Sequence, residues 1–307
     1  MHIDVSTYIL NFSALGDYLM KTTKALENLL SSIKTYITDN AIDSGFCLSD
    51  HAYLLDGCVC LYKKTKDKAY LDFVKNYIDS AVLKRSNKED LCKELFDNDC
   101  NKYTLGTVST FLFDETGDEK YKSLARKLYE DLIERLKEAG DITLPEGIKE
   151  YECYMPFYTD YETRWNKKNG YNDICDRFKN ACDFIKSDRG NKVSLCDRIL
   201  FLKSVVDSLS VLSIQIYEDY RFLEDILRSG TRDLFFDPKD FDEVLKLDDQ
   251  YKVLSSYILF KGIKEGHISS EKYRGLATEL FETAGKEIKT DDLRNAGAYM
   301  MAAAVLE

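Results

Sequence analysis

The stretch TKDKAYLDFVKNYI at residues 65–78 decides the fold, because it recurs with changes as TGDEKYKSLARKLY at residues 116–129. Both copies begin Thr-x-Asp-x-x-Tyr and continue with a helical pattern. Their tyrosines, Tyr70 and Tyr121, lie 51 residues apart. A repeat of this length predicts one supersecondary unit stacked on copies of itself.

Later tyrosines keep the same period. Tyr171 follows Tyr121 after 50 residues, and Tyr273 follows after a further 102 residues, which is two periods. The intermediate copy is expected near Tyr220, where YEDYRFLEDIL preserves the pattern in degraded form. The repeat therefore extends through most of the chain.

Each unit reads as two helices. After Tyr121 a stripe of leucines recurs every four residues, with charged residues on the other side, which is typical of an outer, half-solvated helix. The stripe consists of Leu124, Leu128, Leu132 and Leu136. The preceding residues 103–113 are almost all apolar or small, so they predict a buried inner helix. The aspartate of each repeated turn is expected to cap the outer helix.

Six such pairs can form an open solenoid or close into a double ring. The 307 residues fit six units and leave almost none for the capping repeats that an open solenoid needs. We therefore predict an all-α (α/α)6 barrel formed by residues 1–307 as a single toroid domain. Only three prolines occur, which agrees with long helices joined by short turns. The inner helices would surround a funnel.

Composition excludes several classes. The net charge of −11 argues against a nucleic-acid partner, which would need a basic face. No apolar run reaches eighteen residues and the start does not resemble a secretory signal, so we expect no membrane association. The nine cysteines form no CxxC pair, which favours reduced thiols in the cytoplasm. No pattern indicates a metal or an organic cofactor.

Several segments resemble the unsaturated glucuronyl and rhamnogalacturonyl hydrolases of glycoside hydrolase families 88 and 105. The inner-turn-outer block at residues 55–79, the block at 106–132 and the stretch MPFYTDYETRWN at 155–166 carry the resemblance. So does AGAYMMAAAVLE at 296–307, which is similar to the family's last inner helix. The chain looks like a divergent member, and the resemblance again implies an (α/α)6 barrel.

The resemblance also implies a reaction. These enzymes remove a terminal 4,5-unsaturated uronic acid from oligosaccharides that polysaccharide lyases produce. An acid protonates the C4=C5 vinyl ether, water adds at C5, and the hemiketal collapses to release the sugar. Such chemistry needs a carboxyl group that stays protonated near neutral pH. An oligosaccharide is thus the expected substrate or ligand.

The first acid of the family is missing from its expected place. It stands five residues before a glycine, and counting back from Gly106 gives Asn101. An amide cannot donate a proton in this way. Asp97 and Asp99 lie just upstream and are candidates to occupy nearby space, although loop or capping roles are common for such residues.

The second acid is expected shortly before the Pro156–Phe157 pair. The candidates are Glu150 and Glu152, and Glu152 is favoured because Tyr151 and Tyr154 flank it. Aromatic walls raise the pKa of a carboxyl group and stack on sugars. The alternative is a solvated loop glutamate.

Four residues are candidates for substrate binding. His51 opens the first inner helix, although a capping role is an alternative, and Tyr151 and Tyr154 are possible sugar platforms. Arg198 is what remains, in LCDRILFL, of the family's Arg-Gly-x-Gly-Trp turn. These departures predict very slow or absent turnover. The alternative function is a non-catalytic carbohydrate-binding or interaction module on the same scaffold.

Overall fold

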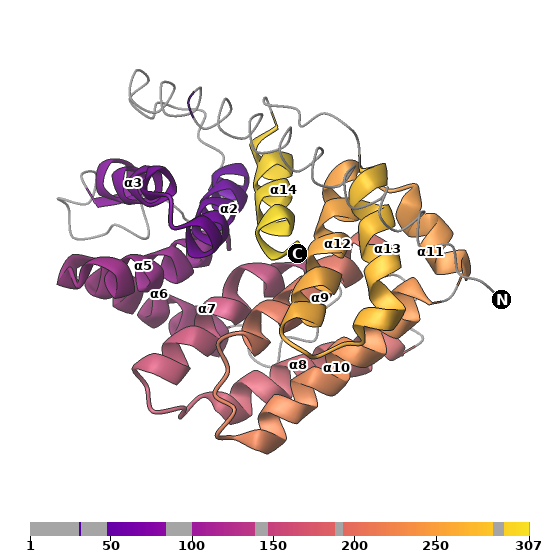
Figure 1. Cartoon of the computed structure of the whole chain (residues 1–307). Coiled ribbons are helices and arrows are strands. Elements are labelled where there is room, and N and C mark those ends of the chain that lie inside the picture. Colours follow the sequence, from indigo (N-terminus) through magenta and orange to yellow (C-terminus); the bar gives the residue numbers. More distant parts are fainter. Residues whose placement is uncertain are drawn as a thin grey trace.

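The computed structural model describes residues 31, 48–83, 100–138, 147–187, 193–236, 238–284 and 292–306. All regular secondary structure within these ranges is helical, which confirms the predicted all-α class (Figure 1).

An inner ring of helices forms the centre of the fold. Its members are α2 (Leu48–Thr65), α5 (Lys102–Thr116), α7 (Tyr151–Arg164), α9 (Leu195–Leu209), α12 (Asp249–Lys264) and α14 (Leu293–Val305). Each of these helices packs against the next one in the order given, and α14 packs against α2. The ring is therefore closed, as the chain length predicted.

Outer helices cover the ring. They are α3 (Lys68–Tyr77), α6 (Glu119–Glu138), α8 (Tyr171–Lys186), α10 (Tyr217–Phe235) and α13 (Ser270–Thr283). Three short elements complete the described part of the chain: η1 (Ile78–Leu83), η3 (Ile148–Glu150) and α11 (Pro238–Leu245). The periodic tyrosines stand in the first turns of α3, α6, α8 and α13, and all four are buried.

The repeated turn has the predicted capping chemistry. Before α3, the Asp67 side chain accepts a hydrogen bond of 2.9 Å from the backbone N–H of Ala69, and the Thr65 hydroxyl accepts one from the N–H of Asp67. Thr116 and Asp118 repeat both bonds before α6. These bonds satisfy donors that the first turn of a helix leaves unpaired, which is why the Thr-x-Asp pattern recurs.

Two glycines let α2 and α14 close the ring. A Cβ atom on Gly297 would lie 2.3 Å from the carbonyl carbon and oxygen of Tyr53, and one on Gly57 would lie 2.7 Å from Cβ of Met300. The two backbones therefore approach to a distance that no side chain permits. At the other end of the contact, Lys64 Nζ donates to the carbonyl of Ala303 in α14 and to that of Leu306, which directly follows the helix.

The alternation of inner and outer helices gives all inner helices the same direction. Because each outer helix returns the chain, the inner helices all begin at the same end of the barrel. Residues near the start of α7 and of α14 therefore lie at one mouth. None of the helices in the described ranges has an apolar stretch long enough to cross a bilayer.

Candidate active site

Polar side chains from five inner helices meet inside the ring. This inner polar cluster comprises Tyr53 and Asp56 on α2, Glu152 on α7, Lys203 and Asp207 on α9, Tyr257 and Lys261 on α12, and Arg294 on α14. Burying charged groups is unfavourable unless they are paired, and a hydrophobic core of the same shape is often at least as stable. Stability alone therefore does not account for the cluster, which makes it the candidate functional site.

Glu152 lies at the mouth, in the first turn of α7. The Tyr53 hydroxyl donates to Glu152 Oε2, and Arg294 Nη2 lies 3.4 Å from Oε1. The Arg294 guanidinium also lies over the Tyr53 ring, 4.8 Å from its centroid. Burial raises the pKa of Glu152 above its ordinary value, while the Lys203 ammonium and the Tyr53 hydrogen bond limit the rise.

Asp207 lies deeper, and cations surround it. Its oxygens accept from Lys203 Nζ at 2.8 Å, from Lys261 Nζ at 2.7 Å and from the Tyr257 hydroxyl at 2.7 Å. Burial opposes ionisation of Asp207, but the two ammonium groups prevail and hold its pKa well below the ordinary value. Burial likewise opposes the charge on Lys203, yet Asp207 raises the pKa of this lysine well above its usual range. Both partners are therefore ionised.

Asp56 stands one helical turn after Tyr53 on the same face of α2. Its side chain interacts electrostatically with Lys203, Asp207, Lys261 and Glu152. It remains partly exposed, and no hydrogen-bond or ion-pair partner reaches its carboxyl group in the described structure. Burial raises the pKa of Asp56 from 3.8 to about 6, against the opposing effect of Lys203. It is a carboxylic acid that titrates near neutral pH.

Arg294 has donors to spare for a ligand. Its Nε atom is buried without a hydrogen-bond partner among the described residues, and within that part of the chain its ion pair is the 3.4 Å contact to Glu152. The side chain is 29% exposed. Because buried donors are normally satisfied, the free N–H of Arg294 is available to an acceptor that a ligand supplies, as is the equally unpartnered Nε of Arg198.

The other predicted site residues lie apart from the cluster. Glu150, in η3, pairs with Arg135 at 3.0 Å, and the ring of His51 packs on Tyr77 of α3. The Tyr151 hydroxyl donates to the carbonyl of Arg177 on α8.

Tyr154 packs beside Tyr151. These two tyrosines thus face the outer layer, whereas Glu152 between them faces inward, because neighbouring positions on a helix point about 100° apart.

Asn101 directly precedes α5 and accepts from the Cys153 thiol, with 3.4 Å between the oxygen and the sulfur. Asn101 therefore lies close to the start of α7, because Cys153 directly follows Glu152 in the first turn of that helix. Asp97 and Asp99 lie outside the described residues.

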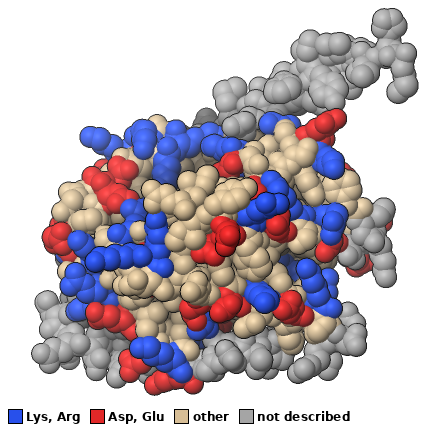
Figure 2. Space-filling model, turned by 90° about the horizontal axis from the view of Figure 1, so that it is seen from below, with Lys and Arg blue, Asp and Glu red and all other residues tan. Residues whose placement is uncertain are grey.

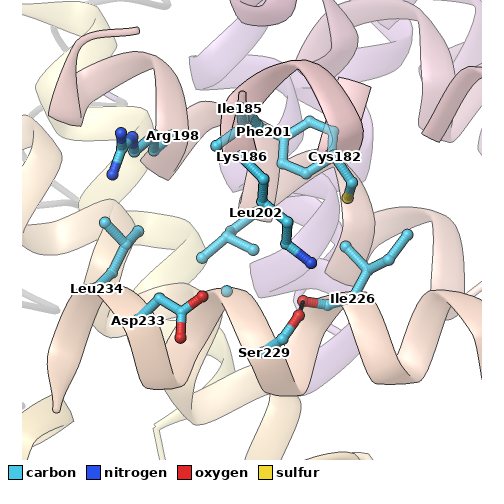
Figure 3. A pocket seen from close by; sticks show the side chains of 11 residues that line it. Cys182, Ile185, Lys186, Arg198, Phe201, Leu202, Ile226, Ser229, Asp233 and Leu234 are labelled. Atoms are coloured by element: carbon cyan, nitrogen blue, oxygen red, sulfur yellow. Dashed lines mark hydrogen bonds between the residues drawn. The ribbon is translucent and has the colours of Figure 1, made fainter. Parts of the chain in front are cut away.

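Arg198 lines a separate crevice between α8, α9 and α10 (Figure 3). This cavity has a volume of about 230 Å³, and Lys186 and Asp233 stand beside apolar side chains in its wall. Arg198 precedes Lys203 by five residues on α9, which turns the two side chains about 140° apart. One therefore faces the outer layer and the other the inside of the ring.

Some members of the inner polar cluster were not predicted from the sequence, although one pattern could have indicated them. Charged residues interrupt the apolar inner helices, as Asp56 does in LLDGCVC and as Lys203 and Asp207 do in LFLKSVVDSL. A charge in a helix buried on all sides must find a partner or a ligand. Among the described residues, no group of His, Cys, Asp and Glu is arranged to hold a metal ion.

Residues 47–189 match the model of Glycosyl Hydrolase Family 88. Over this segment, which is slightly less than half of the chain, the protein is glycoside hydrolase-like. The matched segment holds the first three inner helices of the described ring, and with them Tyr53, Asp56 and Glu152. A comparison with curated proteins found no match.

Two solved structures share the fold of this chain. A family 105 glycoside hydrolase of C. acetobutylicum ATCC 824 is similar with a TM-score of 0.64 and 17% identity, over 91% of this chain and 98% of that one. A polysaccharide lyase is similar with a TM-score of 0.58 and 13% identity, over 93% of this chain and 97% of that one. At these identities the likeness establishes the fold, and it confirms the (α/α)6 barrel.

Proposed function

We propose that this glycoside hydrolase-like protein binds and hydrolyses oligosaccharides that end in a 4,5-unsaturated uronic acid. The observation that carries the proposal is Arg294, which is partly exposed, has an unpaired Nε and stands beside Glu152. A guanidinium is the preferred partner of a carboxylate, because its N–H groups match the two carboxylate oxygens. Arg294 would therefore hold the uronate carboxylate at the mouth of the ring.

Neighbouring groups suit the rest of the reaction. Protonation of the C4=C5 bond requires an acid, and the inner polar cluster contains two carboxyl groups, Glu152 and Asp56, whose pKa values burial raises. The ring of Tyr53, under the Arg294 guanidinium, keeps that cation in place. The site thus combines an anion-binding group with Glu152 beside it and with Asp56, one helical turn after Tyr53 on α2.

The binding step is tested by substituting Arg294 and, as a control, Arg198. In isothermal titration calorimetry with an unsaturated uronyl disaccharide, Arg294→Gln should weaken binding about ten- to a hundredfold, since a hydrogen bond to a charged group contributes roughly 1.5–3 kcal/mol. Arg198→Gln is the matched control, because this arginine faces the crevice of Figure 3. The saturated disaccharide should likewise bind more weakly to Arg294→Gln than to Arg198→Gln.

Two results would count against the proposal. If the unaltered protein binds neither disaccharide, the assigned ligand is wrong. If Arg198→Gln loses affinity and Arg294→Gln does not, the site lies in the crevice. Turnover, followed as loss of absorbance from the conjugated double bond, then separates an enzyme from a binding module.

The second candidate function is carbohydrate binding without turnover. Asn101 favours it, because an amide stands at the start of α5, where the resemblance leads one to expect an acid. In that case the disaccharide would bind at Arg294 and its absorbance would persist.

Other features agree with a protein of the cytoplasm that has no nucleic-acid partner. The seven described cysteines are all free, although the sulfurs of Cys100 and Cys153 lie only 3.4 Å apart. Free thiols are typical of a reducing compartment. Lysine and arginine side chains are interspersed with aspartate and glutamate over the face in Figure 2.

A further inference from the structure

The three carboxyl groups of the inner polar cluster differ in what surrounds them. Asp207 accepts from two lysines and a tyrosine, and Glu152 interacts with Tyr53 and Arg294. Asp56 has no such donor within the described structure. Donors stabilise the ionised form of a carboxyl group, and burial without donors stabilises the neutral form. Asp56 is therefore the carboxyl group of the cluster whose neutral form no hydrogen-bond donor in the described structure opposes.

The protonation of Asp56 sets the net charge of the site. The charged members of the cluster are Lys203, Lys261, Arg294, Asp207, Glu152 and Asp56. With Asp56 neutral and the other five ionised, the cluster holds three positive and two negative charges, a balance of one positive charge. A uronic acid brings one negative charge. The ligand thus neutralises the site only while Asp56 is protonated.

We propose that Asp56 is the proton donor of the hydrolysis and that its neutral state is the state that binds the uronate. The inference rests on the proposed function. It explains how the protein can supply a proton although Asn101 stands where the family's acid is expected.

The step balances as follows in atoms and charge. Asp56 gives its proton to C4, and the π electrons of the C4=C5 bond form the new C–H bond. Water adds to the resulting oxocarbenium ion at C5 and loses a proton to Glu152. The C5 hemiketal opens with cleavage of the bond between C5 and the ring oxygen, and C1 then expels the second sugar as an alcohol. Solvent returns the proton from Glu152 to Asp56, so one water is consumed.

Several groups face Asp56 and will affect its titration. They are Cys60 on α2, Glu152 on α7, Lys203 and Asp207 on α9, and Lys261 and Tyr257 on α12. The two lysines and Asp207 hold their charges throughout the neutral range, because each stabilises the other. Burial keeps the Cys60 thiol protonated by raising its pKa to about 11, and burial and Asp207 raise the pKa of Tyr257 as well. Burial raises the pKa of Glu152 as well, and the Glu152→Gln variant removes its contribution to the pH dependence.

The test separates binding from turnover. Affinity for the unsaturated disaccharide and its rate of hydrolysis are measured from pH 5 to pH 8 for the unaltered protein, Asp56→Asn and Glu152→Gln. Asparagine has the shape of the protonated aspartate but no proton to give. Asp56→Asn should bind with an affinity that changes little with pH, and should lose about a hundred- to ten-thousandfold in rate.

The unaltered protein should bind more weakly above about pH 6. The decrease is tenfold for each unit by which the ligand raises the pKa of Asp56. Glu152→Gln should keep this pH dependence. A urea unfolding curve for each variant shows whether it is folded.

Each outcome bears on a different claim. Loss of all binding by the unaltered protein removes the proposed function itself. Turnover by Asp56→Asn within a few-fold of normal overturns the role of Asp56 and leaves the function standing. Binding without turnover by the unaltered protein overturns the proton-donor role. If Asp56→Asn does not fold, the pH dependence of the unaltered protein decides. An affinity and a rate that do not change from pH 5 to pH 8 would overturn both the proton-donor role of Asp56 and the binding of the uronate by its neutral state.

Discussion

The contact between α2 and α14 predicts opposite effects for one substitution at two positions. Gly297 lies in α14 against the backbone of α2, and Gly275 lies in α13 with nothing within 4 Å of its Cβ position. Both are interior positions of helices. Alanine is favoured over glycine there by about 1 kcal/mol, so local propensity alone would make both Gly→Ala variants more stable.

The magnitude follows from the distance to α2. A Cβ on Gly297 would lie 2.3 Å from the carbonyl of Tyr53 and 2.6 Å from the N atom of Leu54, where ordinary contacts begin near 3.4 Å. The helices must therefore separate by roughly 1 Å, because backbone atoms cannot rotate away as a side chain can. Overpacking of this kind destabilises by about 1–3 kcal/mol, which exceeds the gain in propensity. Gly275→Ala should stabilise by about 0.5–1 kcal/mol.

Urea unfolding of the two variants and the unaltered protein measures the difference. The midpoint should fall for Gly297→Ala and rise for Gly275→Ala, with an unchanged dependence of free energy on urea concentration. Because Tyr53 carries the hydrogen bond to Glu152, the first variant should also bind the unsaturated disaccharide less well. A Gly297→Ala protein as stable as the unaltered one would show that α2 and α14 do not meet as described, and the account of ring closure would then be wrong.

Two further predictions concern buried charges. Asp207→Asn should lower the free energy of unfolding by about 3–5 kcal/mol, because two ammonium groups lose their partner, whereas the same substitution at the exposed Asp233 should change it by less than about 0.5 kcal/mol in matched urea titrations. Asp56 has a folded pKa of about 6, above its ordinary 3.8, so its contribution to stability is present below about pH 4 and is lost as the pH rises through about 6. As the pH rises, the free energy of unfolding of Asp56→Asn should increase relative to that of the unaltered protein by up to about 3 kcal/mol, as measured from unfolding curves at several pH values. A difference between the two proteins that does not vary with pH would contradict the raised pKa.

The sequence by itself determined the helical repeat, because its signals are local. The Thr-x-Asp turn caps a helix with atoms two residues away, and the leucine stripe of α6 follows from 3.6 residues per turn. The chain length favoured the closed ring over an open solenoid. Glu152 was the best candidate acid from its neighbours, and it does lie in the inner polar cluster.

Only the tertiary structure decided which charges meet. Arg294 lies 142 residues from Glu152, and Lys261 lies 54 residues from Asp207, so no spacing in the sequence relates the members of either pair. The direction of a side chain on an inner helix depends on the rotation of that helix in the ring. A rotation of about 100° would exchange Glu152 for Tyr151 at the centre. Packing between neighbouring helices fixes this rotation, and it is therefore the closure of the ring that places Asp56 in the inner polar cluster.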